Sequence, residues 1–133
     1  MILLGLFQKN YYISDDQRRW NAIWDLWAEE KARSPYAELM TYQSEMEHGG
    51  HEDYFENMIQ IGNLPYEISV LEQILPVNLK KNLQKAYKAF LVLQVNEEDE
   101  KSEDTLERCD DFFFEHEDQI DQILRGYASE IRL

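Results

Sequence analysis

The sequence predicts an all-α fold, a compact single domain of about five to seven helices over residues 1–133. Apolar residues recur at intervals of three and four in most segments, which is the period of one helical face. Pro and Gly residues interrupt these segments, as expected for helices joined by short connections. No internal repeat and no Gly/Ser-rich linker divides the chain, and 44% hydrophobic residues are enough for one core.

The first helix is expected from about Asp15 to Arg33, after an N-terminal arm formed by residues 1–13. Ser14 stands at the N-cap position and Gln17 three residues later, which is the arrangement of a capping box. Four apolar side chains of this helix share one face: Trp20, Ile23, Trp24 and Trp27. We interpret this face as part of the core, and a partner-binding or dimer face is the alternative.

A second helix is predicted between two breakers. Ser34 and Pro35 suit the N-cap and first helical positions, and the two glycines after His48 end the helix. The segment "HEDYFEN" that follows is expected to form a short helical turn. This turn returns Tyr54 and Phe55 to the core.

Two further helices and an acidic stretch come next. The motif "IGNLP" breaks the chain before a helix from about Pro65 to Leu75, which Pro76 ends. Asn78 can cap the next helix, from about Leu79 to Val95. The stretch "NEEDEKSED", residues 96–104, is predicted to be an acidic loop or a fraying helix end, and the apolar spacing of the remaining residues is helical.

Negative charge is concentrated in one segment. The formal net charge is −14, and residues 95–121 hold 13 acidic and two basic side chains, a net charge of −11. Such a surface repels nucleic acid and an anionic membrane, because binding either requires clustered Lys and Arg, whereas it attracts a basic protein. The predicted partner-binding residues are Glu97, Glu98, Asp99, Glu100, Glu103, Asp104, Glu107, Asp110, Asp111, Glu115, Glu117, Asp118 and Asp121.

The same features bear on the compartment. The N-terminal run "MILLGLF" lacks the basic start and the cleavage pattern of a signal peptide. No segment approaches the roughly 18 apolar residues that span a bilayer. The single cysteine, Cys109, fits a reducing compartment, so we expect a cytoplasmic protein without a membrane association.

Patterns typical of catalysis and of metal binding are incomplete. Glu45 and His48 form one Glu-x-x-His pair of the kind found in di-iron helix bundles, but the second pair is missing. His48 and His51 could share a zinc ion only on one helical face, and the glycines between them argue against this. Cys109 and His116 have no accompanying oxyanion loop or orienting group. We expect no enzymatic activity and no cofactor; a metal protein that uses His48 and His51 is a remote alternative.

The segment "HGGHEDYFEN" resembles the Asn-Gly-Gly-Phe-x-Gln-Tyr-Phe-x-Asn signature of the DNA-mimic-protein-like family, small bacterial all-α domains mostly of unknown function. His48, His51 and Asp53 depart from the signature, and five residues match it: Gly49, Gly50, Tyr54, Phe55 and Asn57. With "LEQILP" and "CDDFFFEHEDQIDQILRGYASEI" the resemblance covers about residues 36–131. It implies a helical fold and, in the member that names the family, an acidic surface that stands in for DNA phosphates.

Two classes of function follow from these observations. In the first, the carboxylates present a phosphate-like array to a basic DNA-binding protein, without direct binding of nucleic acid. In the second, they keep a small helical domain soluble and neutralise the stripe of Lys81, Lys85 and Lys88, within the chain or across a homodimer. An immunity-type inhibitor of a basic toxin is a further interaction role, which electrostatics alone does not separate from mimicry.

Overall fold

Six α-helices account for most of residues 13–133, the part of the chain that the computed structural model describes. They are α2 (Asp15–Ala28), α3 (Tyr36–Ile61), α4 (Leu64–Ile74), α5 (Val77–Val95), α6 (Glu100–Glu115) and α7 (Glu117–Ala128). The prediction of an all-α fold is confirmed for these residues. The predicted N-terminal arm lies outside them except for Ile13.

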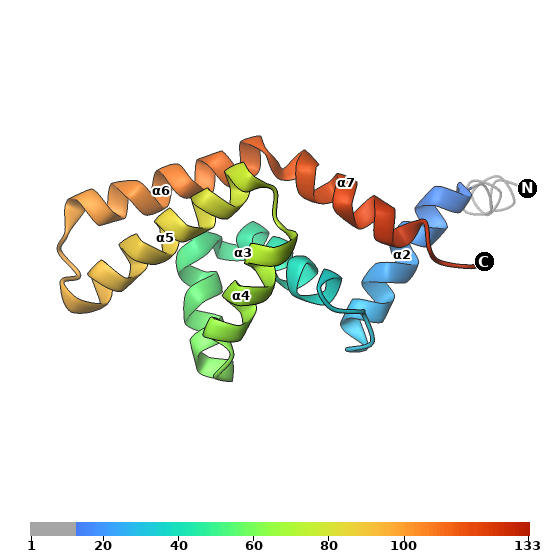
Figure 1. Cartoon of the computed structure of the whole chain (residues 1–133), viewed down its shortest axis with the longest axis horizontal. Helices are drawn as coiled ribbons and strands as arrows, with labels where there is room; N and C mark the ends of the chain where they lie inside the picture. Colours follow the sequence, from blue (N-terminus) through green and yellow to red (C-terminus); the bar gives the residue numbers. More distant parts are fainter. Residues whose placement is uncertain (1–12) are drawn as a thin grey trace, which may run out of the picture.

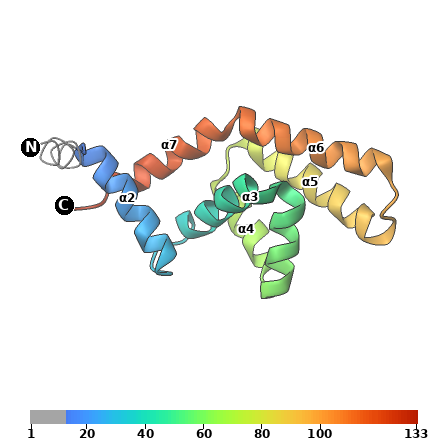
Figure 2. The same cartoon turned by 180° about the vertical axis from the view of Figure 1, so that it is seen from behind.

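The helices are arranged along one long axis (Figure 1). At one end α5 and α6 lie side by side as a hairpin, and its tip projects beyond the other helices in both views (Figures 1 and 2). At the other end α2 packs against α7, which continues the line of α6 after a break at His116. Helices α3 and α4 lie between the two ends and contact each other.

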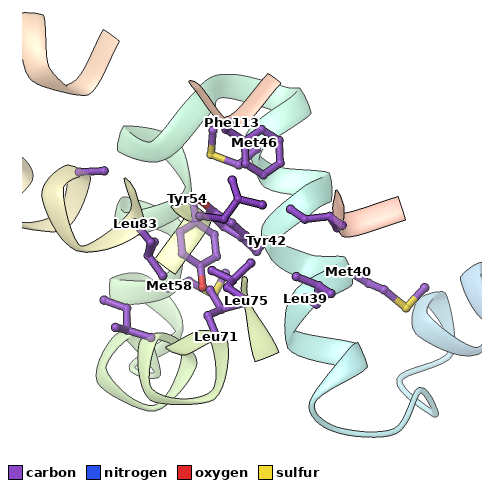
Figure 3. Packing of buried hydrophobic residues seen from close by; sticks show 14 of the residues in the cluster. Leu39, Met40, Tyr42, Met46, Tyr54, Met58, Leu71, Leu75, Leu83 and Phe113 are labelled. Atoms are coloured by element: carbon purple, nitrogen blue, oxygen red, sulfur yellow. The ribbon is translucent and has the colours of Figure 1, made fainter. Parts of the chain in front are cut away.

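One continuous core joins the helices, with α3 at its centre (Figure 3). The Tyr42 ring lies edge-on to the rings of Tyr54 and Phe113, with centroids 5.0 and 5.2 Å apart. All three residues are fully buried, as are Phe55 and Phe90. The core therefore ties the two halves of α3 to α5 and to α6.

Helix α2 is shorter than predicted. Its Ser14 N-cap is confirmed, because the hydroxyl accepts a hydrogen bond from the Gln17 amide at 3.1 Å. The helix ends at Ala28 rather than Arg33, and Glu30 takes a left-handed conformation with φ of 60°. No Gly or Pro marks this end in the sequence. The tryptophan face does pack on the core, with Ile23 fully buried and the three indoles half-buried.

Helix α3 includes the predicted second helix and the segment after it. Gly49 and Gly50 have non-helical backbone angles, so the predicted interruption is confirmed. The second half runs on to Ile61, much further than the expected short turn, and Gly62 ends it with φ of 82°. At the start of the helix the N-cap position belongs to Pro35 rather than Ser34.

The boundaries of α4 and α5 differ from the predictions by one or two residues, and the larger change is the start of α6. Helix α5 begins at Val77 with Pro76 as its N-cap, so Asn78 lies inside the helix instead of capping it. Helix α6 begins at Glu100, so residues 96–99 of "NEEDEKSED" connect α5 to α6 and the remainder of the stretch is helical. Asp99 caps α6, because its carboxylate accepts a hydrogen bond from the Ser102 amide at 3.1 Å.

The end of α7 forms a clasp with the region around α2. The Arg33 amide donates to the Tyr127 hydroxyl at 3.0 Å, and the Arg33 guanidinium pairs with Glu130 at 2.7 Å. Arg19 donates to the backbone carbonyl of Ile131 at 3.2 Å. These contacts close the chain between residues about one hundred positions apart.

Candidate acidic interaction surface

The 13 predicted partner-binding carboxylates fall into two groups by exposure. Nine are exposed: Glu97, Glu98, Glu100, Glu103, Asp104, Glu107, Asp111, Glu115 and Asp118. Four are half-buried: Asp99, Asp110, Glu117 and Asp121. The structure therefore does not bring all 13 together on one surface.

Six of the exposed carboxylates form what we call the acidic row. Helix α6 buries Ser102, Leu106, Cys109 and Phe113. On the opposite side it carries Glu100, Glu103, Asp104, Glu107, Asp111 and Glu115. With a rise of about 1.5 Å per residue, the row is about 22 Å long and carries roughly one charge per 4 Å. A single strand of duplex DNA carries one charge per about 3.4 Å of axis.

The row is held by contacts on the other side of α6. The Asn82 amide of α5 donates to the Cys109 carbonyl at 2.8 Å, and Leu106 and Phe113 lie in the core. At the start of the helix, the Asp99 carboxylate accepts bonds from both the amide and the hydroxyl of Ser102. Asp99 thus orients the row and has less free capacity for a partner.

Asp110 faces inward, unlike Asp111, the next residue in the sequence. Its carboxylate accepts a hydrogen bond from the His51 amide at 3.0 Å and another from His51 Nδ1 at 2.7 Å. These bonds connect α6 to the interruption of α3. Asp110 therefore joins two helices within the molecule, and we do not count it in the acidic row.

His51 is fully buried, with both ring nitrogens in use. Because Nδ1 donates to Asp110, Nε2 accepts from the Tyr42 hydroxyl, which lies 2.6 Å away. Burial lowers the pKa of His51 and raises that of Tyr42. The order of hydroxyl, imidazole and carboxylate is that of a nucleophile with its base, but a substrate has no access because neither Tyr42 nor His51 has exposed surface.

The two signature glycines lie close to carboxylates, and Gly50 makes room for the contact between His51 and Asp110. Gly50 has φ of 79°, and a Cβ atom placed there would lie 2.5 Å from Asp110 Oδ2. A Cβ on Gly49 would lie 1.7 Å from Asp53 Oδ2. A side chain at Gly50 would therefore be strained by the backbone and would also push Asp110 away from His51.

The other three signature residues stabilise the second half of α3. Tyr54 and Phe55 have no exposed surface, which confirms the prediction that they return to the core. The Asn57 amide donates to Glu45 at 2.6 Å and so joins the two halves of the helix across the interruption. All three have local packing or hydrogen-bonding roles in this structure.

Glu117 and Asp121 of α7 face α3. The buried Gln43 amide nitrogen donates to Glu117 at 3.1 Å and to Asp121 at 2.8 Å. Burial, together with the adjacent Glu47 carboxyl group, raises the pKa of Glu117 to about 7. Near neutral pH Glu117 is therefore only partly ionised and adds less charge than an exposed carboxylate.

The residues considered for catalysis and for metal binding do not assemble into a site. Burial raises the pKa of the Cys109 thiol, which disfavours the nucleophilic thiolate. His116 Nδ1 donates to the Phe112 carbonyl at 2.8 Å, and its ring stacks on that of Phe112. His48 is exposed, while both His51 nitrogens are engaged. Within residues 13–133 no group of three or more His, Cys, Asp or Glu side chains could hold a metal ion.

Sequence reasoning missed the contact between His51 and Asp110, although both positions carry a signal. His51 precedes Tyr54 and Phe55 by three and four residues, so it shares their buried helical face. Asp110 follows Leu106 by four residues and precedes Phe113 by three, which places it at the edge of the apolar face. The high density of carboxylates around Asp110 obscured its position.

No family model matches the chain, and no curated protein and no solved structure matches it. The resemblance to the DNA-mimic-protein-like family therefore stays a prediction that rests on the residues quoted for it. Among the helices of residues 13–133, none has the length and apolar character needed to cross a membrane.

Proposed function

We propose that this chain is a non-enzymatic interaction protein whose acidic row binds the basic, DNA-contacting surface of a DNA-binding protein. The observation that carries the proposal is the position of the row, on the side of α6 opposite the buried face. Carboxylates held on a rigid helix can occupy positions that DNA phosphates take on such a partner. The row would then compete with DNA for one basic surface.

The charges of the row are free for a partner. Among residues 13–133, none of its six carboxylates forms an ion pair. Lys81, Lys85 and Lys88 of α5 also form no ion pair within that range, although they lie on the adjacent helix. Neutralisation of this lysine stripe inside one chain therefore has no support from the contacts, and external binding is favoured.

The half-buried carboxylates have internal roles that limit their part in binding. Asp99, Asp110, Glu117 and Asp121 all accept hydrogen bonds from side chains or amides of the same chain. Binding a partner through them would break these bonds. The proposed surface therefore consists of the row together with the exposed Glu97, Glu98 and Asp118.

The test compares two variants that lose the same amount of charge. The row variant carries Glu103→Gln, Glu107→Gln and Asp111→Asn, and the control carries Asp25→Asn, Glu29→Gln and Glu56→Gln, all at exposed positions. Each is immobilised and used at low salt to recover proteins from a nuclease-treated extract of the source cell. We expect the wild type and the control to retain DNA-binding proteins, and the row variant to lose them.

Competition with duplex DNA then shows whether the row binds the DNA-contacting surface of the partner. Excess duplex DNA should release the retained proteins, because row and DNA would occupy the same basic site, and retention should fall steeply as salt rises. Equal retention by the row variant would contradict the proposal. Retention that depends on the row but resists DNA would instead favour an inhibitor of another basic protein.

A further inference from the structure

Two adjoining hollows lie between α5 and α6, with volumes of about 500 and 410 Å³. Lys85 and Thr105 line both hollows, so they form one continuous groove along the hairpin. We call it the basic groove, because four cationic side chains line it: Lys85, Lys88, Lys101 and Arg108.

These cations have no anionic partner within the described part of the chain. None of the four forms an ion pair there, although the whole sequence contains 27 acidic residues. Asp99 is the one carboxylate among the lining residues, and its Oδ2 atom accepts both bonds from Ser102. The groove is therefore a local positive site on a molecule whose net charge is −14.

The groove also has an apolar component that the acidic row matches. Val92 lines the groove and is 41% exposed. Phe114 is 47% exposed and lies within the row, three residues after Asp111 and seven after Glu107. A ligand that fits the groove thus combines several carboxylates with an exposed apolar side chain, and the row has this composition.

We propose that the basic groove binds the acidic row of a second copy of this chain. The row and the groove lie on adjacent sides of the same hairpin, since Arg108 directly follows Glu107 in α6. The tip of the hairpin projects beyond the other helices (Figures 1 and 2), and the cations of the groove and the carboxylates of the row are all exposed. Two copies related by a twofold axis can therefore each place a row in the other's groove.

The association of two copies is weak, and both very low and very high salt concentrations reduce it. A contact confined to one row and one groove on each copy is small, and small interfaces are typical of transient complexes. At about 0.01 M salt the Debye length is roughly 30 Å, so the like net charges repel before contact. At about 0.15 M the length falls to roughly 8 Å, whereas at about 1 M the contact pairs themselves are screened. Dimerisation is therefore strongest at intermediate salt.

The proposal is tested by sedimentation equilibrium of the full chain at high protein concentration and at these three salt concentrations. At intermediate salt the wild type should shift from the 16.0 kDa monomer towards twice that mass. A groove variant, Lys85→Glu with Lys88→Glu, and a row variant, Glu103→Lys with Glu107→Lys, should each stay monomeric. An equimolar mixture of the two should recover the dimer, because each then offers the charge that the other lacks.

A dimer in the mixture would not result from attraction between the net charges of the two variants, because both variants remain net negative. As a matched control, Lys31→Glu with Arg132→Glu removes the same charge at exposed positions far from the hairpin and should dimerise like the wild type. A wild type that stays at 16.0 kDa at all three salt concentrations, or a mixture that stays monomeric, would overturn the proposal. Partner binding would be unaffected by that failure, because it is measured separately through competition with DNA.

Discussion

Asp110 and Asp111 are neighbours in one helix, yet the structure uses them differently. Asp110 faces the core and accepts two hydrogen bonds from His51, whereas Asp111 faces outward in the acidic row and has no partner among the described residues. The rotation of about 100° between successive helical residues separates an internal contact from an external surface. In a segment this acidic, the side of the helix decides the role of a carboxylate, and composition does not.

The largest expected change in stability comes from a substitution of Gly50, whose backbone lies against the Asp110 carboxylate. Gly50→Ala places a side chain at a left-handed position and against the Asp110 carboxylate. The backbone strain and the disturbed contact with His51 should together lower the free energy of unfolding by about 2–4 kcal/mol. Chemical denaturation followed by circular dichroism measures this change.

Gly126→Ala is the matched control for this substitution. Gly126 lies in α7, and a Cβ atom there would meet nothing within 4 Å. Because alanine is favoured over glycine in a helix, the control should raise stability by about 0.5–1 kcal/mol. Equal effects of the two substitutions would contradict the role assigned to Gly50.

The second prediction tests the comparison directly. Asp110→Ala removes the acceptor of the His51 amide and of its ring N–H, and should cost about 1–3 kcal/mol of unfolding free energy. Asp111→Ala changes charge and size in the same way on the exposed side and should stay within about 0.5 kcal/mol of the wild type. If the two substitutions lowered the free energy of unfolding equally, Asp110 and Asp111 would not have the different roles that we assign to the inner and outer sides of α6.

Glu117 lies between these extremes, and its effect should depend on pH. The pKa of Glu117 is about 7 in the folded protein and about 4.5 in the unfolded chain. Between pH 4.5 and pH 7 the folded state therefore binds more protons than the unfolded state. Stability from this group therefore falls as pH rises from about 4.5 to 7 and is level above that range.

Glu117→Gln removes this fall, and the difference between the unfolding curves of the two proteins isolates it. Buried His51 contributes an opposite slope, because its lowered pKa makes the folded state gain stability as pH rises towards 6.5. That contribution is common to both proteins. Parallel pH profiles for wild type and variant would argue against the raised pKa of Glu117.

The smallest effect is expected in the acidic row itself. Glu103, Glu107 and Asp111 are four residues apart and repel one another along the helix. Glu107→Gln should therefore stabilise the protein by a few tenths of a kcal/mol at low salt, and the gain should vanish at about 1 M salt. A loss of stability in this variant would mean that Glu107 has an internal partner.

Local signals predicted much of the fold. The Ser14 cap, the interruption at Gly49 and Gly50 and the apolar periods of α4 and α5 all depend on residues close in sequence. The end of α2 was wrong, because Glu30 turns the chain without the Gly or Pro that usually marks such a position. The acidic stretch was predicted to be a loop or a fraying helix end because of its charge, whereas α6 begins within it at Glu100 and Asp99 is the helix cap.

The candidate site was predictable only in part. The sequence shows that carboxylates are concentrated in residues 95–121, but their orientation depends on where α6 begins and which face it buries. The basic groove depends on the pairing of α5 with α6, which brings Lys85 and Arg108 to one hollow. Such a juxtaposition of residues from two helices is a tertiary property, and helical periodicity alone does not provide it.

The clasp at the other end of the molecule has a consequence for the order of folding. Its hydrogen bonds join residues 94 and 112 positions apart, from Arg33 to Tyr127 and from Arg19 to Ile131. The contacts of the α5–α6 hairpin are far more local and close much shorter loops. Because loop closure costs entropy before a distant contact forms, the hairpin should assemble early and the clasp late. The clasp would then slow unfolding more than it speeds folding. It would increase kinetic stability without taking part in the folding nucleus.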